Sequence, residues 1–263
     1  MAQPAALARR RCDTRFPNQC RTASSVGVGP ASPTSLLPAR HCCLSSLEAA
    51  FFYEPAGFVS GDYVDLIPSG PEAFYFALGD VSGKGVAASM LMSHLHATLR
   101  TLLSMHQPIE EVVTTASRTF CQSTLPTQFA TLVLGKADRD GKVELVNAGH
   151  TPVLLVQGDE LQVIAAAGLP LGMFCSTDFT SVKRRVSAES TLLLYSDGIT
   201  ESTDEAGNEY DLGRLAETLL QSRDMPPCEI VDTIHRNILR YTNDSQPSDD
   251  RTMLALRSTP KGI

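Results

Sequence analysis

The sequence lacks an excess of positive charge and lacks any long apolar run. Its 263 residues carry 22 lysines and arginines against 29 aspartates and glutamates, a formal net charge of −7. This balance argues against a nucleic-acid partner and against an anionic membrane surface, because both attract basic faces. No apolar run approaches the ~20 residues that a membrane-spanning helix needs. We therefore expect neither nucleic acid nor a membrane among the partners of this chain.

The cysteines also lack a recognisable pattern. There are seven of them, an odd number, and none forms a Cys-x-x-Cys pair. This spacing predicts no zinc site and no disulfide framework, so a cytoplasmic, reducing location is the simplest expectation.

The N-terminal residues differ in composition from the rest of the chain. Residues 1–35 carry five arginines against a single acid, Asp13, among Pro, Ser, Ala and Gly residues. No apolar core follows the arginines, which argues against a secretory signal and favours a flexible basic tail. We expect one folded domain over residues 36–257 and a short C-terminal tail over residues 258–263.

The chain is organised around residues 74–90, where a buried-type strand leads into Asp80, a glycine turn and a helix. A phosphate-binding P-loop is excluded, because Gly79 precedes Gly83-Lys84 by one residue too few and Gly85 stands where a hydroxyl is required. Asp80 is then either a ligand for a hard cation or a turn residue that binds local amides. Other carboxylates at similar positions in the chain would favour the cation-ligand interpretation.

Helix and strand signals alternate from about residue 50 to the end, which predicts an α+β domain. Helical spacing of apolar residues predicts helices that each cover a sheet. The expected helices span residues 86–103, 108–120, 212–220 and 226–241. Hairpin signals between residues 129 and 164 predict a β-meander. The expected strands span residues 49–54, 58–67, 74–79, 129–134, 143–147, 153–156, 161–164, 179–186, 191–195 and 252–256.

Four carboxylates occupy glycine-flanked or strand-end positions along the folded part: Asp62, Asp80, Asp197 and Asp249. Mg²⁺ and Mn²⁺ prefer carboxylate, carbonyl and water oxygens, and a bare group of aspartates would repel itself without them. The pattern favours a two-cation site, with Asp250 a weaker choice than Asp249.

At this point the sequence resembles the PPM, or protein phosphatase 2C-like, metal-dependent serine/threonine phosphatases, in the bacterial branch that includes SpoIIE and RsbU. The resemblance covers about residues 36–257, and the motifs are specific only together and in this order. They are Leu36-Leu37-Pro38, Val59-Ser60-Gly61-Asp62-Tyr63-Val64-Asp65, Asp80-Val81-Ser82-Gly83-Lys84-Gly85, Asn147-Ala148-Gly149-His150, Gly168-Leu169-Pro170-Leu171-Gly172, Tyr195-Ser196-Asp197-Gly198-Ile199-Thr200-Glu201 and Asp249-Asp250-Arg251-Thr252.

The resemblance implies a four-layer αββα sandwich of two antiparallel sheets flanked by helices. It further implies that two Mn²⁺ or Mg²⁺ ions bind where the sheets meet. Asp80 would bridge both ions, the Val81 carbonyl would bind the first, Asp197 and Asp249 would hold the second, and Asp62 would act through bound waters.

The implied reaction is hydrolysis of a phosphoserine or phosphothreonine ester. Two cations roughly 3.5–4 Å apart would neutralise the phosphate and lower the pKa of the attacking water. Ser82 stands where the broader family has a histidine, so the sequence offers no evident acid for the leaving group. Lys84 and His150 are candidate substrate contacts, although a solvated lysine and a locally bonded turn histidine are the alternatives.

The resemblance also suggests a substrate and a setting. The expected substrate is an anti-sigma-factor antagonist in bacterial partner-switching signalling, with control by a separate regulatory protein acting on residues 86–103. The alternative is an inactive phosphatase-like domain that binds a phosphoprotein as a regulatory module. Three residues depart from the family pattern without removing a ligand: Ser60, Val64 and Arg251, which takes a position that is usually apolar.

Overall fold

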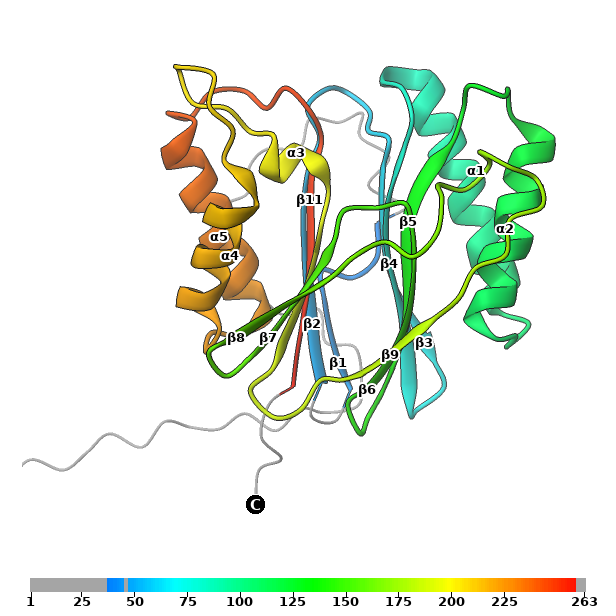
Figure 1. Cartoon of the computed structure of the whole chain (residues 1–263), viewed down its shortest axis with the longest axis horizontal. Helices are drawn as coiled ribbons and strands as arrows, with labels where there is room; N and C mark the ends of the chain where they lie inside the picture. Colours follow the sequence, from blue (N-terminus) through cyan, green and yellow to red (C-terminus); the bar gives the residue numbers. More distant parts are fainter. Residues whose placement is uncertain (1–36, 45–46, 259–263) are drawn as a thin grey trace, which may run out of the picture.

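The structure is a computed structural model that describes residues 37–44 and 47–258. Two antiparallel sheets lie face to face and helices cover both outer surfaces, so the chain forms four layers (Figure 1). Helices α4 and α5 cover one sheet, and α1 and α2 cover the other. The expected αββα sandwich is confirmed. The expected basic tail lies outside the described residues.

The two sheets contain six and five strands. The order in the first is β1-β2-β11-β10-β7-β8, and the order in the second is β3-β4-β5-β6-β9. The strands are β1 His41–Leu44, β2 Leu47–Glu54, β3 Asp62–Ser69, β4 Ala73–Val81, β5 Ala130–Asp138, β6 Lys142–Ala148, β7 Val153–Gln157, β8 Glu160–Ile164, β9 Val182–Arg185, β10 Thr191–Tyr195 and β11 Arg251–Ser258. The helices are α1 Gly85–Leu103, α2 Ile109–Ser123, α3 Asp197–Thr200, α4 Asp211–Ser222 and α5 Pro227–Tyr241.

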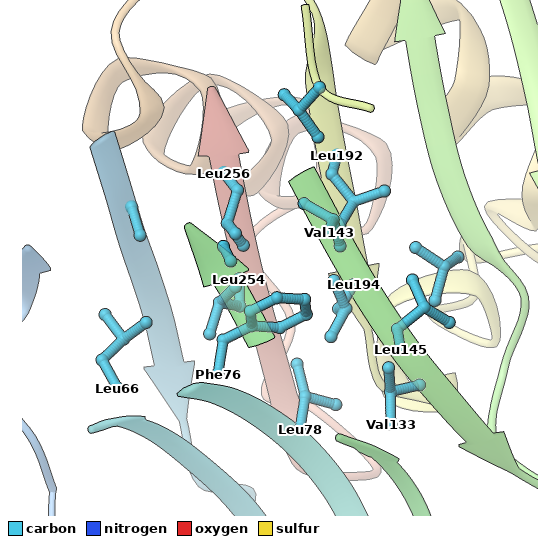
Figure 2. Packing of buried hydrophobic residues seen from close by; sticks show 14 of the residues in the cluster. Leu66, Phe76, Leu78, Val133, Val143, Leu145, Leu192, Leu194, Leu254 and Leu256 are labelled. Atoms are coloured by element: carbon cyan, nitrogen blue, oxygen red, sulfur yellow. The ribbon is translucent and has the colours of Figure 1, made fainter. Parts of the chain in front are cut away.

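Strand β4 shows why the sheets need cover on both faces. Its alternate residues Phe74, Phe76 and Leu78 point into the core between the sheets, where they meet leucines of β10 and β11 (Figure 2). The intervening Tyr75 and Ala77 pack against α1 and α2 instead. Because successive side chains of a strand point to opposite faces, an apolar run in this strand is buried on both.

The predicted meander over residues 129–164 is wrong. Strand β6 pairs with β5 in the five-stranded sheet, whereas β7 pairs with β10 and β8 in the six-stranded sheet. The chain therefore crosses from one sheet to the other at residues 149–152. Both sheets contribute apolar side chains to one core, so the local pattern does not say to which sheet a strand belongs.

Other expectations need smaller corrections. Residues 58–61 are not part of a strand, and β1 was not expected at all. Asp197 begins the short helix α3 rather than ending a strand. Strand β11 runs to Ser258, the first residue of the expected C-terminal tail. In the part of the chain that the structure describes, no helix is long and apolar enough to cross a membrane.

The expectation of no disulfide is also wrong. Cys121, near the end of α2, is bonded to Cys175 in the loop between β8 and β9. The two cysteines are 54 residues apart in sequence, and only the packing of that loop against α2 brings them together.

Candidate metal centre

The first half of the site is a pair of carboxylates on adjacent strands. Asp62, the first residue of β3, lies directly opposite Asp80 near the end of β4. Gly61 permits this approach, because a Cβ at that position would lie 3.0 Å from the Val81 carbonyl oxygen and 3.3 Å from Asp80 Oδ1. The Gly-Asp order in the sequence therefore has a steric cause.

The second half forms where β10 and β11 meet. These strands are antiparallel neighbours, so Asp197, after β10, lies near Asp249, before β11. Ser196 Oγ donates a hydrogen bond to the Asp250 carbonyl and accepts one from the Thr252 amide, at 3.1 and 2.9 Å. A Cβ on Gly198 would lie 2.1 Å from the same carbonyl, so only glycine fits there.

Hydrogen bonds from the beginning of β11 join the two halves. Thr252 Oγ1 donates to the Asp62 carboxylate, which links the six-stranded sheet to the five-stranded one. The Asp250 carboxylate accepts the backbone amides of Ala56 and Gly61 at 2.8 and 3.0 Å. Asp250 thus fixes the loop that precedes Asp62. These contacts explain how four carboxylates from distant parts of the chain come to one end of the sandwich.

The gathered carboxylates raise one another's pKa. Burial, and then the charges of Asp197, Asp249 and Asp250, raise the pKa of Asp80 to about 7. Burial and the neighbouring Asp80 raise the pKa of Asp62 well above its usual range. Burial and Asp249 raise the pKa of Asp197. Such a group is stabilised by protons or by a hard cation.

The donor set fits Mg²⁺ or Mn²⁺ in its chemistry, because it consists of carboxylates and the Val81 carbonyl. Within residues 37–44 and 47–258, no group of three or more His, Cys, Asp or Glu side chains is arranged so that it could hold a metal ion. The carboxylates therefore approach one another closely enough to interact but do not form a finished cage. Bound waters commonly complete the coordination of Mg²⁺, so an open arrangement is compatible with this ion.

Lys84 lies at the edge of the site and contacts one of its carboxylates. Its Nζ atom is 2.8 Å from Asp249 Oδ2, and its side chain is 70% exposed. It also donates to the Ser248 carbonyl at 3.1 Å. Asp249 thus contacts an exposed lysine through one oxygen and accepts the adjacent Asp250 amide through the other, whereas both oxygens of Asp250 bind amides of the loop before Asp62. This difference supports Asp249 over Asp250 as the metal-binding candidate.

His150 is buried, and its ring faces the interior. Nδ1 lies 2.8 Å from Thr131 Oγ1, which in turn donates to the Asp80 carbonyl at 3.3 Å. Burial lowers the pKa of His150 to about 4, so the ring is neutral near pH 7. This geometry favours the locally bonded turn histidine over a substrate contact.

The side chain of Ser82 is bound to the backbone. Its Oγ accepts the Phe129 amide at 3.0 Å. The sequence reasoning did not anticipate the structural roles of Ser196, Thr131 and Thr252. The only signal for Thr252 was its place in the Asp249-Asp250-Arg251-Thr252 motif.

Comparison with known proteins identifies the family. The family model described as Stage II sporulation protein E (SpoIIE) matches residues 70–259, more than half of the chain. The chain belongs to the SpoIIE family. The expected SpoIIE/RsbU branch of the PPM phosphatases is thereby confirmed.

Relatives of known sequence cover most of this chain. It is 28% identical to protein IcfG of Synechocystis over 78% of its length, which corresponds to 37% of IcfG. It is 27% identical to the phosphoserine phosphatase RsbU of Bacillus subtilis, over 77% of this chain and 61% of RsbU. The chain spans about a quarter of another SpoIIE family member, the stage II sporulation protein E of B. subtilis (26%).

Solved structures of bacterial proteins share the fold. The RsbU and RsbW domains of a Mycobacterium tuberculosis protein match with a TM-score of 0.72 at 25% identity, over 86% of this chain and 63% of that one. The PP2C phosphatase domain of B. subtilis SpoIIE, solved with a regulatory fragment, matches with a TM-score of 0.70 at 22% identity, over 82% of this chain and 64% of that one.

Proposed function

We propose that this chain is a metal-dependent protein serine/threonine phosphatase. The observation that carries the proposal is the meeting of Asp62, Asp80, Asp197 and Asp249 at one end of the sandwich, with burial and mutual repulsion raising the pKa of three of them. A relative, RsbU, is named as a phosphoserine phosphatase. The site and the family point to the same class of reaction.

The proposed ligands of two Mn²⁺ or Mg²⁺ ions are the four carboxylates and the Val81 carbonyl. Asp80 lies opposite Asp62, and the charges of Asp197 and Asp249 raise its pKa. This central position supports its assignment as the bridging ligand. When bound, the ions would neutralise the phosphate dianion and acidify the attacking water. Lys84 supplies a tethered positive charge beside Asp249 that could orient a phosphate oxygen.

The finer substrate assignment rests on the relatives. RsbU and RsbP of B. subtilis are both named phosphoserine phosphatases, and a similar solved structure joins RsbU and RsbW domains. We propose a phosphorylated anti-sigma-factor antagonist as the substrate and a separate protein acting on α1 as the regulator. The proposed cytoplasmic location rests on this kind of substrate. The cysteine pattern no longer supports it, because Cys121 and Cys175 form a disulfide.

A phosphopeptide assay tests the proposal. Phosphoserine and phosphothreonine peptides are incubated with the protein in Mn²⁺, in Mg²⁺ and in excess chelator. We expect phosphate release that requires the metal and needs neither zinc nor thiol. Full turnover by metal-stripped protein would contradict the metal-dependent reaction. Peptide binding without turnover under every metal condition would instead favour the inactive phosphatase-like module.

A further inference from the structure

Arg251 is a buried charge next to the proposed metal centre. It is the first residue of β11, two positions after Asp249, and it is 2% exposed. A buried guanidinium is costly unless it is paired and hydrogen-bonded. Its polar partners are therefore the first thing to establish.

The guanidinium reaches the turn that carries Asp197. Arg251 Nε donates to Ser202 Oγ at 3.0 Å, and Ser202 Oγ donates to the Gly198 carbonyl at 2.7 Å. Gly198 directly follows Asp197 in helix α3. A two-bond chain therefore connects the strand that follows Asp249 with the helix that begins at Asp197.

The other side of the guanidinium is anchored to the six-stranded sheet and its covering helix. Arg251 Nη1 donates to Glu54 Oε2 at 3.3 Å, and Glu54 is its direct neighbour across β2 and β11. His235 Nε2 of α5 lies 3.4 Å from the same oxygen. The His235 ring packs against Phe52 at a tilt of 30°, with ring centroids 4.1 Å apart. The arginine is thus held between fixed partners rather than at the end of a loose side chain.

We propose that Arg251 is a positioning residue that holds the α3 turn against the start of β11, so that Asp197 and Asp249 can share one cation. The inference rests on the proposed metal-dependent function. Two like charges held close together repel each other. Partners behind metal ligands fix the orientation of those ligands, and their loss typically costs roughly 10–100-fold in metal affinity or activity.

Arg251→Met tests this role, because methionine is unbranched and flexible enough to fill the buried space but has no guanidinium to donate hydrogen bonds. Ser202→Ala breaks the same chain of hydrogen bonds at its middle and leaves the arginine in place. Arg257→Met is the matched control. Arg257 is also in β11 and 6% exposed, but its Nη1 donates to the Met225 carbonyl at 3.0 Å, at the far end of the strand.

Mn²⁺ affinity is measured by titration calorimetry on the whole chain, and phosphopeptide kinetics are measured at low and at saturating Mn²⁺. We expect Arg251→Met to weaken Mn²⁺ binding by roughly 10–100-fold and Ser202→Ala to weaken it less, while Arg257→Met binds like the parent. At saturating Mn²⁺ the Arg251→Met protein should recover most of its kcat with an unchanged peptide KM.

Three outcomes would overturn the inference. If both Arg251→Met and Ser202→Ala bind Mn²⁺ as the parent does, the positioning role is refuted while the proposed function stands. If Arg257→Met weakens Mn²⁺ binding as much as Arg251→Met, the loss follows the removal of any buried arginine of β11 and the specific role of Arg251 is refuted. If the parent itself binds no Mn²⁺ and hydrolyses no phosphopeptide, the proposed function fails and this inference fails with it.

Discussion

Replacing Asp80 by asparagine should stabilise the metal-free protein at alkaline pH while abolishing hydrolysis. The neutral amide keeps the size of the side chain but removes a charge that Asp197, Asp249 and Asp250 oppose. Burial is the larger cause of the raised pKa, and it acts in the same direction. The substitution therefore removes a source of instability that a bound cation would otherwise remove.

The magnitude follows from the pKa of Asp80, which rises from 3.8 to about 7 in the folded chain. The folded state then holds the proton more tightly than the unfolded state. The favourable contribution of Asp80 is present at low pH and is lost as pH rises from 3.8 through about 7. At about 1.4 kcal/mol per pKa unit, the loss reaches roughly 4 kcal/mol at pH 8, an upper value because Asp80 is partly exposed to solvent.

The assay is urea denaturation of parent and variant in excess chelator at pH 5 and pH 8. The advantage of Asp80→Asn should grow by about 2–3 kcal/mol between these pH values. Asp65→Asn is the contrasting control. Asp65 is buried and accepts two hydrogen bonds from Arg100, both 2.8 Å long. Its neutralisation should destabilise the protein, because the buried carboxylate loses two charge-assisted hydrogen bonds from the half-exposed Arg100.

Mn²⁺ supplies the second comparison. The melting temperature of the parent should rise when Mn²⁺ is added, because a ligand that binds only the folded state stabilises that state. The Asp80→Asn protein should gain little. If the stability difference between parent and variant does not change with pH, the electrostatic reasoning is refuted. An active Asp80→Asn protein that still gains melting temperature with Mn²⁺ would remove Asp80 from the site.

Three further predictions concern other parts of the chain. Lys84→Ala should retain far more activity than Asp80→Asn in the phosphopeptide assay, whereas a nucleotide-cradle site predicts the opposite ranking. It should change the free energy of unfolding by less than about 1 kcal/mol, because exposed ion pairs contribute little to stability. The Cys121→Ser/Cys175→Ser double variant should lose about 4 kcal/mol of unfolding free energy for a cross-link spanning 54 residues, and an unchanged urea midpoint would exclude the disulfide. Because the pKa of His150 is lowered to about 4, the free energy of unfolding should fall by up to about 3 kcal/mol as pH falls from 6.5 towards 4. In chelator, His150→Gln should flatten that part of the pH dependence.

The local elements of this protein could be predicted because their causes are local. The apolar run before Asp80 and the helical spacing after Val86 correctly predicted β4 and α1. Amphipathic spacing, with prolines at or beside their first turns, correctly predicted α2 and α5. The four candidate aspartates were found because each lies beside a glycine or at a strand end, where a backbone can approach a ligand.

Partners that are distant in sequence could not be predicted. Apolar alternation in β6 and β7 records burial but not the sheet in which each strand lies, so the meander expectation failed. Asp249 and Asp250 are identical in type, and only tertiary contacts distinguish their roles: Lys84 contacts Asp249, whereas Asp250 accepts the amides of Ala56 and Gly61.

The sequence by itself determined most of the strands and helices, though not β1 or α3, and it identified carboxylates near their ends, because periodicity and glycine spacing act over a few residues. The tertiary structure alone decided which of those ends meet. It brought Cys121 to Cys175, and it placed Arg251 between Glu54 and Ser202. Such contacts depend on strand order and sheet packing, and these are set by burial summed over the whole core rather than by any one stretch of chain.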